Sequence, residues 1–506
     1  MKDNKTKEAT KEQLDYLYNN MGETISFMYP SLLNSIRLYN LLISFEEDFD
    51  NKALLINIVR INYQVLFTHL DIATIFRAEL RADTPWEKRV HLKYVYAVLT
   101  EAFKALFGFD TNKQTLWKKF CNEAKDFIEE DERVSIELQI NQFRNNHLNK
   151  TTEDFRNYVV HYDYDPLKVY DFWSVISEQS VVNLINSYLA LSLDVWCLIE
   201  KVLGNPKLEI NRYAYASPTF DILSVFERIN SFSDKRGKLL GKMKAGVAIY
   251  VSSLDSMVKN YRIPTKIETK LGLDTMMSQM QPFLESVHPL MLLHLISIDI
   301  GCVIIAYLTS QHYIEKQLIL RHLNVIVYEC FNKLYGFDCV EPEGSKKEKA
   351  TWQLSYWKSL LYPTIMDSGS DEWKEKACNI ESQFQQLAKD SSIKNEKLRL
   401  MSVHIREKNN KDYIPRFLEE LIKMNPIIEM SKALKLYGIV HDVIKLNKEV
   451  INIQCSKIKA VQDKKLDEIK SNLKSICSMF LRYSNDESAK RKVRQTTDEI
   501  LSLMDT

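Results

Sequence analysis

Arginine and histidine recur at one spacing in two distant parts of the sequence. Arg156, Asn157 and His161 lie in TEDFRNYVVHYDYDP, and Arg399 and His404 lie in KLRLMSVHIREK. In both segments the histidine follows the arginine by five residues. On an α-helix this is about 1.4 turns, so the two side chains project from neighbouring edges of one face and can reach the same phosphate. The pattern indicates acid–base chemistry at a phosphate.

These residue types meet the needs of RNA cleavage. Attack of a ribose 2′-hydroxyl on its phosphate requires a base for that proton, an acid for the leaving 5′-oxygen and positive charge beside the phosphorane. His161 can act as acid or base, because histidine titrates near neutral pH. Arg156 offers a cationic fork for phosphate oxygens, and Asn157 can orient the histidine or bind a phosphate oxygen. His404 and Arg399 would supply a second proton-transfer group and a second charge, giving a 2′,3′-cyclic phosphate and a 5′-hydroxyl.

The two halves of the chain are related by an internal repeat. Residues 92–110, LKYVYAVLTEAFKALFGFD, align without gaps on residues 320–338, LRHLNVIVYECFNKLYGFD, and the register extends back through Glu87/Glu315 to Asp71/Asp299. The match covers two predicted helices and the turn between them, which indicates a duplication. The identical pairs in the last ten positions are Glu101/Glu329, Phe103/Phe331, Leu106/Leu334, Gly108/Gly336, Phe109/Phe337 and Asp110/Asp338.

Four acidic residues of the repeat have two interpretations. Asp71/Asp299 and Glu101/Glu329 can orient catalytic groups, or they can serve helix packing and capping. Packing or capping is the favoured interpretation, because recurring acidic side chains within helices more often have structural partners.

The motifs resemble the signature of the HEPN superfamily, which is Arg, a polar residue, three variable residues and His. Residues 156–161 fit it fully, whereas residues 399–404 fit it only at the ends because Leu400 takes the polar position. The resemblance covers roughly residues 50–203 and 280–450. It implies two tandem helical-bundle repeats packed as a pseudo-dimer, with the two motifs facing each other in one composite site.

The resemblance also implies an activity. HEPN proteins of this type are metal-independent endoribonucleases that use no cofactor, and many are antiphage-defence, abortive-infection or toxin effectors. RNA is then the expected partner, and an antitoxin, an activating protein or a second copy of the chain are compatible further partners. With Arg156, Asn157, His161, Arg399 and His404 as catalytic residues, no metal ligands are expected.

Composition favours an all-α fold. Only 12 Gly and 12 Pro occur in 506 residues, so long helices fit better than many short strands with turns. We expect an N-terminal helical domain over residues 1–203, a linker and connecting helices over 204–275, a second helical domain over 276–450, and a basic helical extension over 451–506. Residues 289–308 are nearly apolar enough to span a bilayer, but the equivalent segment 61–80 is charged, so a buried core helix is predicted for both.

Several other functions are disfavoured. A net charge of +1 predicts no nucleic acid by itself, so any phosphate-binding surface must come from local clusters. The eight cysteines form no Cys-x-x-Cys pair, which disfavours zinc and suits a reducing cytoplasm. The segment GKLLGKMKAG at 237–246 lacks the ending of a nucleotide-binding loop. The N-terminal residues resemble no secretory signal, so a cytoplasmic protein without a membrane partner is expected.

The main alternative is a protein of another class. A non-catalytic helical RNA-binding or scaffold protein could retain the fold and a degenerate motif. A nuclease requires the two motifs to lie near each other in an open basic cleft, whereas a scaffold leaves them apart or buried. A toxin held inactive by a separate antitoxin is a third interpretation.

Overall fold

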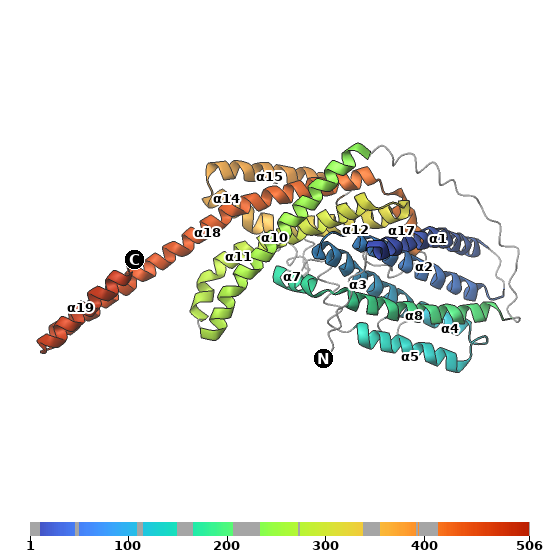
Figure 1. The fold of residues 1–506 in the computed structure, drawn as a ribbon, viewed down its shortest axis with the longest axis horizontal. Helices are drawn as coiled ribbons and strands as arrows, with labels where there is room; N and C mark the ends of the chain where they lie inside the picture. Colours follow the sequence, from blue (N-terminus) through green and yellow to red (C-terminus); the bar gives the residue numbers. More distant parts are fainter. Residues whose placement is uncertain are drawn as a thin grey trace, which may run out of the picture.

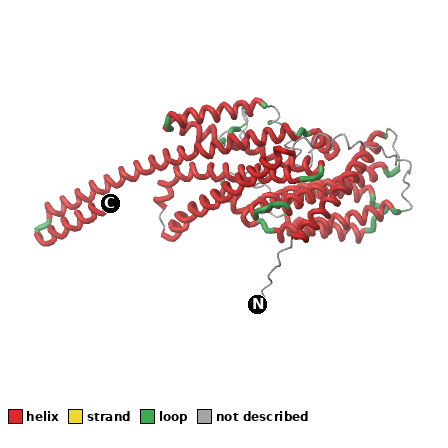
Figure 2. Tube along the Cα trace, turned by 45° about the horizontal axis from the view of Figure 1, so that its top comes forward, coloured by secondary structure: helices red, strands yellow, loops and turns green. Residues whose placement is uncertain are grey.

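The computed structural model describes residues 11–45, 50–108, 115–148, 165–205, 233–271, 274–336, 355–390, 393 and 413–504, and within them it contains helices and no strand. The all-α prediction is confirmed (Figures 1 and 2). The helices of the first half are α1 (Lys11–Ser44), α2 (Lys52–Leu80), α3 (Pro85–Phe107), α4 (Leu116–Glu123), α5 (Glu130–His147), α7 (Pro166–Val175) and α8 (Glu178–Leu203).

The second half contains a similar series. A π-helical turn, η3, stands near the place that α4 takes in the first half. The elements are α10 (Ser233–Leu271), α11 (Asp274–Thr309), α12 (Tyr313–Leu334), η3 (Trp357–Leu361), α14 (Tyr362–Ser368), α15 (Asp371–Lys389), α17 (Tyr413–Lys423), α18 (Pro426–Tyr483) and α19 (Glu487–Met504). Of the predicted linker and connecting helices at 204–275, residues 206–232 and 272–273 lie outside the described residues.

The order of helix packing occurs twice. α1 lies along α2 and α10 lies along α11, while α5 packs on α8 and α15 packs on α18. α7 contacts α3, and α17 contacts α12. Aromatic rings stack in both halves, Phe103 on Phe143 at 5.0 Å and Tyr335 on Phe384 at 4.9 Å, although Tyr335 corresponds to Phe107 in the repeat. Several contacts between helices thus recur in the two halves.

The most apolar helix is an internal one. Within the described ranges, two segments are long and apolar enough to cross a membrane, Val287–Thr309 and Glu178–Leu203, and the apolar window of the first is 89% buried inside the fold. This confirms the core-helix prediction for residues 289–308. The equivalent helix α2 is also largely buried, and its Asp71, Arg77 and Glu79 are enclosed with it. Buried charges of this kind require partners within the protein.

Glycine ends the third helix of each repeat, where the Gly of the GFD sequences at 108–110 and 336–338 predicts a left-handed C-terminal cap. Gly108 has φ 68° and ψ 167°, and Gly336 has φ 81°. The positive φ is as expected, but Gly108 is extended rather than left-handed helical, because the chain leaves the helix directly instead of closing another turn. This region of φ and ψ is essentially restricted to glycine.

We expect Gly108→Ala to lower the free energy of unfolding by about 1–3 kcal/mol, because alanine is strained at this φ and ψ. Gly438 in the middle of α18 is the control, since a Cβ there meets nothing within 4 Å. Gly438→Ala should stabilise by about 0.5–1 kcal/mol through the higher helix propensity of alanine. Urea unfolding followed by circular dichroism measures both, and equal effects of the two variants would contradict the assignment.

Candidate functional site

All five predicted catalytic residues lie outside the described residues. These are Arg156, Asn157, His161, Arg399 and His404. The structure does describe the helices that follow each motif along the chain. The first motif ends five residues before Pro166, where α7 begins, and the second ends nine residues before Tyr413, where α17 begins.

The helix α7 connects the two repeats. Asp165 caps it by accepting a hydrogen bond from the Leu167 amide at 3.0 Å, and Pro166 occupies its first turn. α7 packs on α3 of its own repeat and on α11 of the other. Its Trp173 is fully buried, and the Lys93 Nζ lies 3.8 Å from the centre of that ring.

The helix α17, like α7, contacts both repeats. It packs on α12 of its own repeat, and its fully buried Phe417 meets Phe67 of α2 edge-on at 5.6 Å between ring centres. The Arg321 guanidinium lies 5.8 Å from the Phe417 ring and 5.7 Å from the Phe67 ring. The helix after each motif therefore packs against a cation of its own repeat and against a helix of the other repeat.

Two buried ion pairs join the repeats at this place. The Lys93 Nζ lies 2.5 Å from the Asp299 Oδ2, and Tyr94 donates a hydrogen bond to the other oxygen of Asp299 at 2.7 Å. In the reverse direction, the Arg321 Nη2 lies 2.5 Å from the Asp71 Oδ2. None of these charged side chains is more than 2% exposed. Each repeat thus supplies one cation and one carboxylate to the other.

The sequence alignment relates these residues to one another. In the gapless register Asp71 corresponds to Asp299, Lys93 to Arg321, and Tyr94 to His322. The Tyr94 and His322 rings lie 4.6 Å apart, so equivalent residues touch each other. This contact between equivalent residues lies between the two reciprocal ion pairs. We call Asp71, Lys93, Tyr94, Asp299, Arg321 and His322 the inter-repeat cluster.

Burial controls the protonation of this cluster. Burial raises the pKa of Asp71, but the adjacent Arg321 and His322 more than offset this, so its pKa lies below the ordinary value. Burial lowers the pKa of Lys93, and Asp299 opposes the shift. Burial and the Arg321 charge also lower the pKa of His322. The cluster is consequently suited to holding helices together rather than to exchanging protons with substrate.

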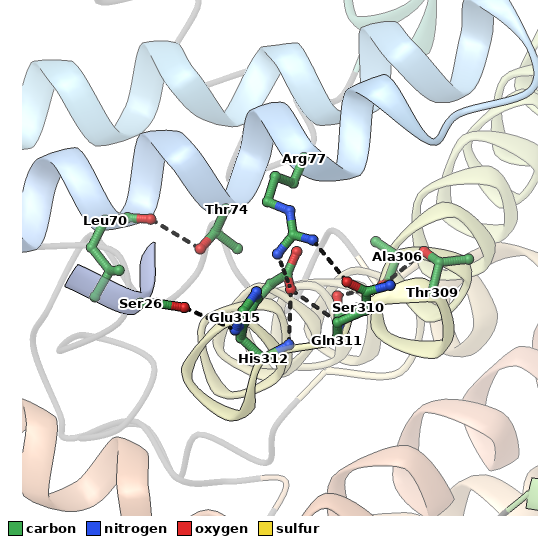
Figure 3. Close-up of polar contacts among 10 residues, drawn as sticks. All are labelled: Ser26, Leu70, Thr74, Arg77, Ala306, Thr309, Ser310, Gln311, His312 and Glu315. Carbon is green, nitrogen blue, oxygen red and sulfur yellow. Dashed lines mark hydrogen bonds and ion pairs between the residues drawn. The ribbon is translucent and has the colours of Figure 1, made fainter. Parts of the chain in front are cut away.

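A second polar contact lies where α2 meets the start of α12 (Figure 3). Arg77 donates to the Glu315 Oε2 at 3.1 Å and to the Gln311 side chain at 3.2 Å, while the Gln311 and His312 amides also donate to Glu315. Glu315 therefore caps its own helix and binds a cation of the other repeat. Its equivalent, Glu87, accepts from the amide of Asp83 at 2.6 Å and caps α3.

The acidic residues of the repeat have structural partners. Asp71 and Asp299 are packing residues of the inter-repeat cluster, which agrees with the favoured interpretation. Glu101 and Glu329 are buried near the ends of α3 and α12, and the Lys104 Nζ lies 3.5 Å from Glu101. No functional role was predicted for Lys93, Tyr94, Arg321 or His322. The repeat alignment places them at equivalent positions, because LKY and LRH open the two aligned segments.

Among the described residues no three His, Cys, Asp or Glu side chains converge to hold a metal ion. A shallow groove of about 520 Å³ lies along α10, beside the start of α3. It is lined by Thr84, Ala248, Val251, Ser252, Asp255, Ser256 and Lys259.

Comparison of this chain with family models, with curated proteins and with solved structures gives no match.

Breaking one inter-repeat ion pair should be costly. We expect Asp299→Ala to lower the free energy of unfolding by about 3–5 kcal/mol, because it leaves the Lys93 ammonium buried without this carboxylate. Lys93→Met combined with Asp299→Ala should cost less than the sum of the two single variants, since neither charge then remains buried alone. Glu372→Ala, which breaks the exposed pair with Lys376 in α15, should change stability little and serves as control. If the losses in unfolding free energy of the single variants at positions 93 and 299, measured by urea unfolding, simply added in the double variant, the pairing would be contradicted.

Acid should destabilise the fold through buried histidines. Burial lowers the pKa of His91 to about 3 and that of His69 to about 4. Between the ordinary value near 6.5 and these values the unfolded chain binds protons that the folded chain does not, so stability is lost as pH falls through this window. We expect His91→Gln to reduce the loss in unfolding free energy between pH 7.5 and pH 5 by about 2 kcal/mol. An unchanged loss in urea titrations at the two pH values would contradict a neutral buried His91.

Proposed function

We propose that this chain is a metal-independent endoribonuclease of the HEPN type with a composite site made by both repeats. The proposal rests on the two Arg-x-x-x-x-His motifs at equivalent places of a duplicated chain. It includes a pseudo-dimeric arrangement of the two repeats. The biological role that the resemblance implies is that of an antiphage-defence or toxin effector.

One structural observation supports the composite site most strongly. The helices that follow the motifs, α7 and α17, both pack at the interface between the repeats, and each contacts a helix of the opposite repeat. Trp173 of α7 covers Lys93, and Phe417 of α17 lies beside Arg321. Both helices therefore contact the same inter-repeat cluster. Such reciprocal packing is what a site shared between two motifs requires.

The chemistry follows from the residue types. One histidine would remove the proton of the ribose 2′-hydroxyl, whose oxygen then attacks the adjacent phosphorus. The other histidine would protonate the departing 5′-oxygen, and Arg156 and Arg399 would stabilise the charge of the phosphorane. Asn157 would orient His161 or bind a phosphate oxygen. The buried pairs would contribute by keeping the two halves in one register.

The test is cleavage of mixed cellular RNA by the purified chain in EDTA. We expect fragments with 2′,3′-cyclic phosphate and 5′-hydroxyl ends, and a loss of about 10²–10⁴-fold in rate for His161→Ala, because a general acid or base contributes this much. His404→Ala shows whether the second motif is catalytic despite Leu400. His147→Ala is the matched control, since His147 lies in α5 of the same repeat, outside the motif.

Two results would count against the proposal. Cleavage that is equally fast in wild type, His161→Ala and His404→Ala would exclude the site. Absence of cleavage by wild type, together with RNA binding that both histidine variants retain, would favour the non-catalytic RNA-binding protein.

A further inference from the structure

The C-terminal helices form a hairpin that projects from the body (Figures 1 and 2). Val450 is the last buried side chain of α18, and from Ile451 to Tyr483 every described side chain is half-buried or exposed. The chain then turns at Ser484, and Asp486 caps α19 by accepting hydrogen bonds from the amides of Ser488 and Ala489. α19 folds back along α18.

One face of the projecting part of α18 is covered by α19. Its half-buried residues follow a helical spacing and meet the inner side of α19, where Thr497 is the one buried residue. The half-buried apolar residues of this face of α18 are Leu466, Leu473, Cys477 and Leu481.

A second apolar row on α18 is open to solvent. It consists of Ile469, Ile476, Met479, Phe480 and Tyr483, which are between 41% and 77% exposed. At 3.6 residues per turn this outer row lies about 100° round the helix from the face that α19 covers. In helical bundles a helix presents two apolar faces at about this angle when it packs on two neighbours. Here one neighbour is present and the other is missing.

We propose that the second neighbour is α18 of another copy of this chain, packed antiparallel on the outer row. A symmetric dimer requires a surface that is complementary to itself, and the charged side chains beside the outer row meet this requirement. Glu468 and Arg482 each lie seven residues from Ser475 on α18. Two antiparallel helices that cross at Ser475 therefore bring Glu468 of each copy opposite Arg482 of the other.

The same charges disfavour other arrangements. A parallel dimer would turn the flank that carries Glu468 and Arg482 toward the side of the partner that α19 covers, so these two charges would not meet across the interface. Glu468 and Arg482 are both exposed, and within the described part of the chain neither forms an ion pair. Exposed pairs are weak individually, so the apolar row provides affinity while the charges select the antiparallel register.

The full-length chain is tested by sedimentation velocity across a concentration series. We expect a dimer for wild type and a monomer for Ile476→Glu, because Ile476 lies beside the crossing point and pairs with itself. Glu468→Arg should weaken the dimer about tenfold by opposing two bases across the interface, and the exchange Glu468→Arg with Arg482→Glu should restore it. Asp467→Lys, an equally exposed charge reversal on the opposite side of α18, should dimerise like wild type.

Each other outcome overturns a stated part of the proposal. A wild-type chain that remains monomeric at every concentration, or an Ile476→Glu variant that still dimerises, excludes this interface. Failure of the exchanged pair to restore the dimer, or disruption by Asp467→Lys, excludes the antiparallel register. Circular dichroism establishes that each variant retains its helices, so a loss of dimer reports on the surface and not on folding.

Discussion

The structure depends on buried charged side chains whose counter-ions belong to the other half of the chain. Lys93 and Asp71 belong to the first repeat, yet their counter-ions are Asp299 and Arg321 of the second. A charge without a partner in an apolar interior is strongly destabilising, so neither half can close its core with these residues without the other half. The apolar contacts of α2, α3, α11 and α12 surround this cluster and exclude water from it. The two repeats consequently behave as one structural unit.

This constraint also determines where the helices after the motifs lie. Trp173 packs over Lys93, and Phe417 lies beside Arg321, so the positions of α7 and α17 follow from the same ion pairs that join the repeats. A shift of one repeat against the other would separate the pairs and move both helices. Catalysis by groups from two chain segments is sensitive to such shifts, because acid and base must stay within reach of one phosphate. Helices held in register by buried ion pairs are compatible with the proposed site, which needs both halves.

The projecting hairpin follows a different physical rule from the body. Where the repeats meet, charges are buried and paired, whereas beyond Val450 most charges of α18 are exposed and apolar side chains remain at the surface. A hairpin of two helices buries little apolar area, so its outer row gains most by association with another surface. Association through this hairpin would leave the inter-repeat cluster untouched.

The sequence alone determined the helical class, the duplication, the core position of residues 289–308 and the glycines that end α3 and α12. These features depend on composition, helical periodicity and local backbone preference, which are properties of short segments. The pairing of Lys93 with Asp299 rather than with Asp71 was decided only by tertiary structure. Both aspartates are compatible with the local sequence, and only the packing of helices that are far apart along the chain selects between them. The roles of Arg156, Asn157, His161, Arg399 and His404 stay predictions, because they depend on where two distant segments meet and these residues lie outside the described part of the chain.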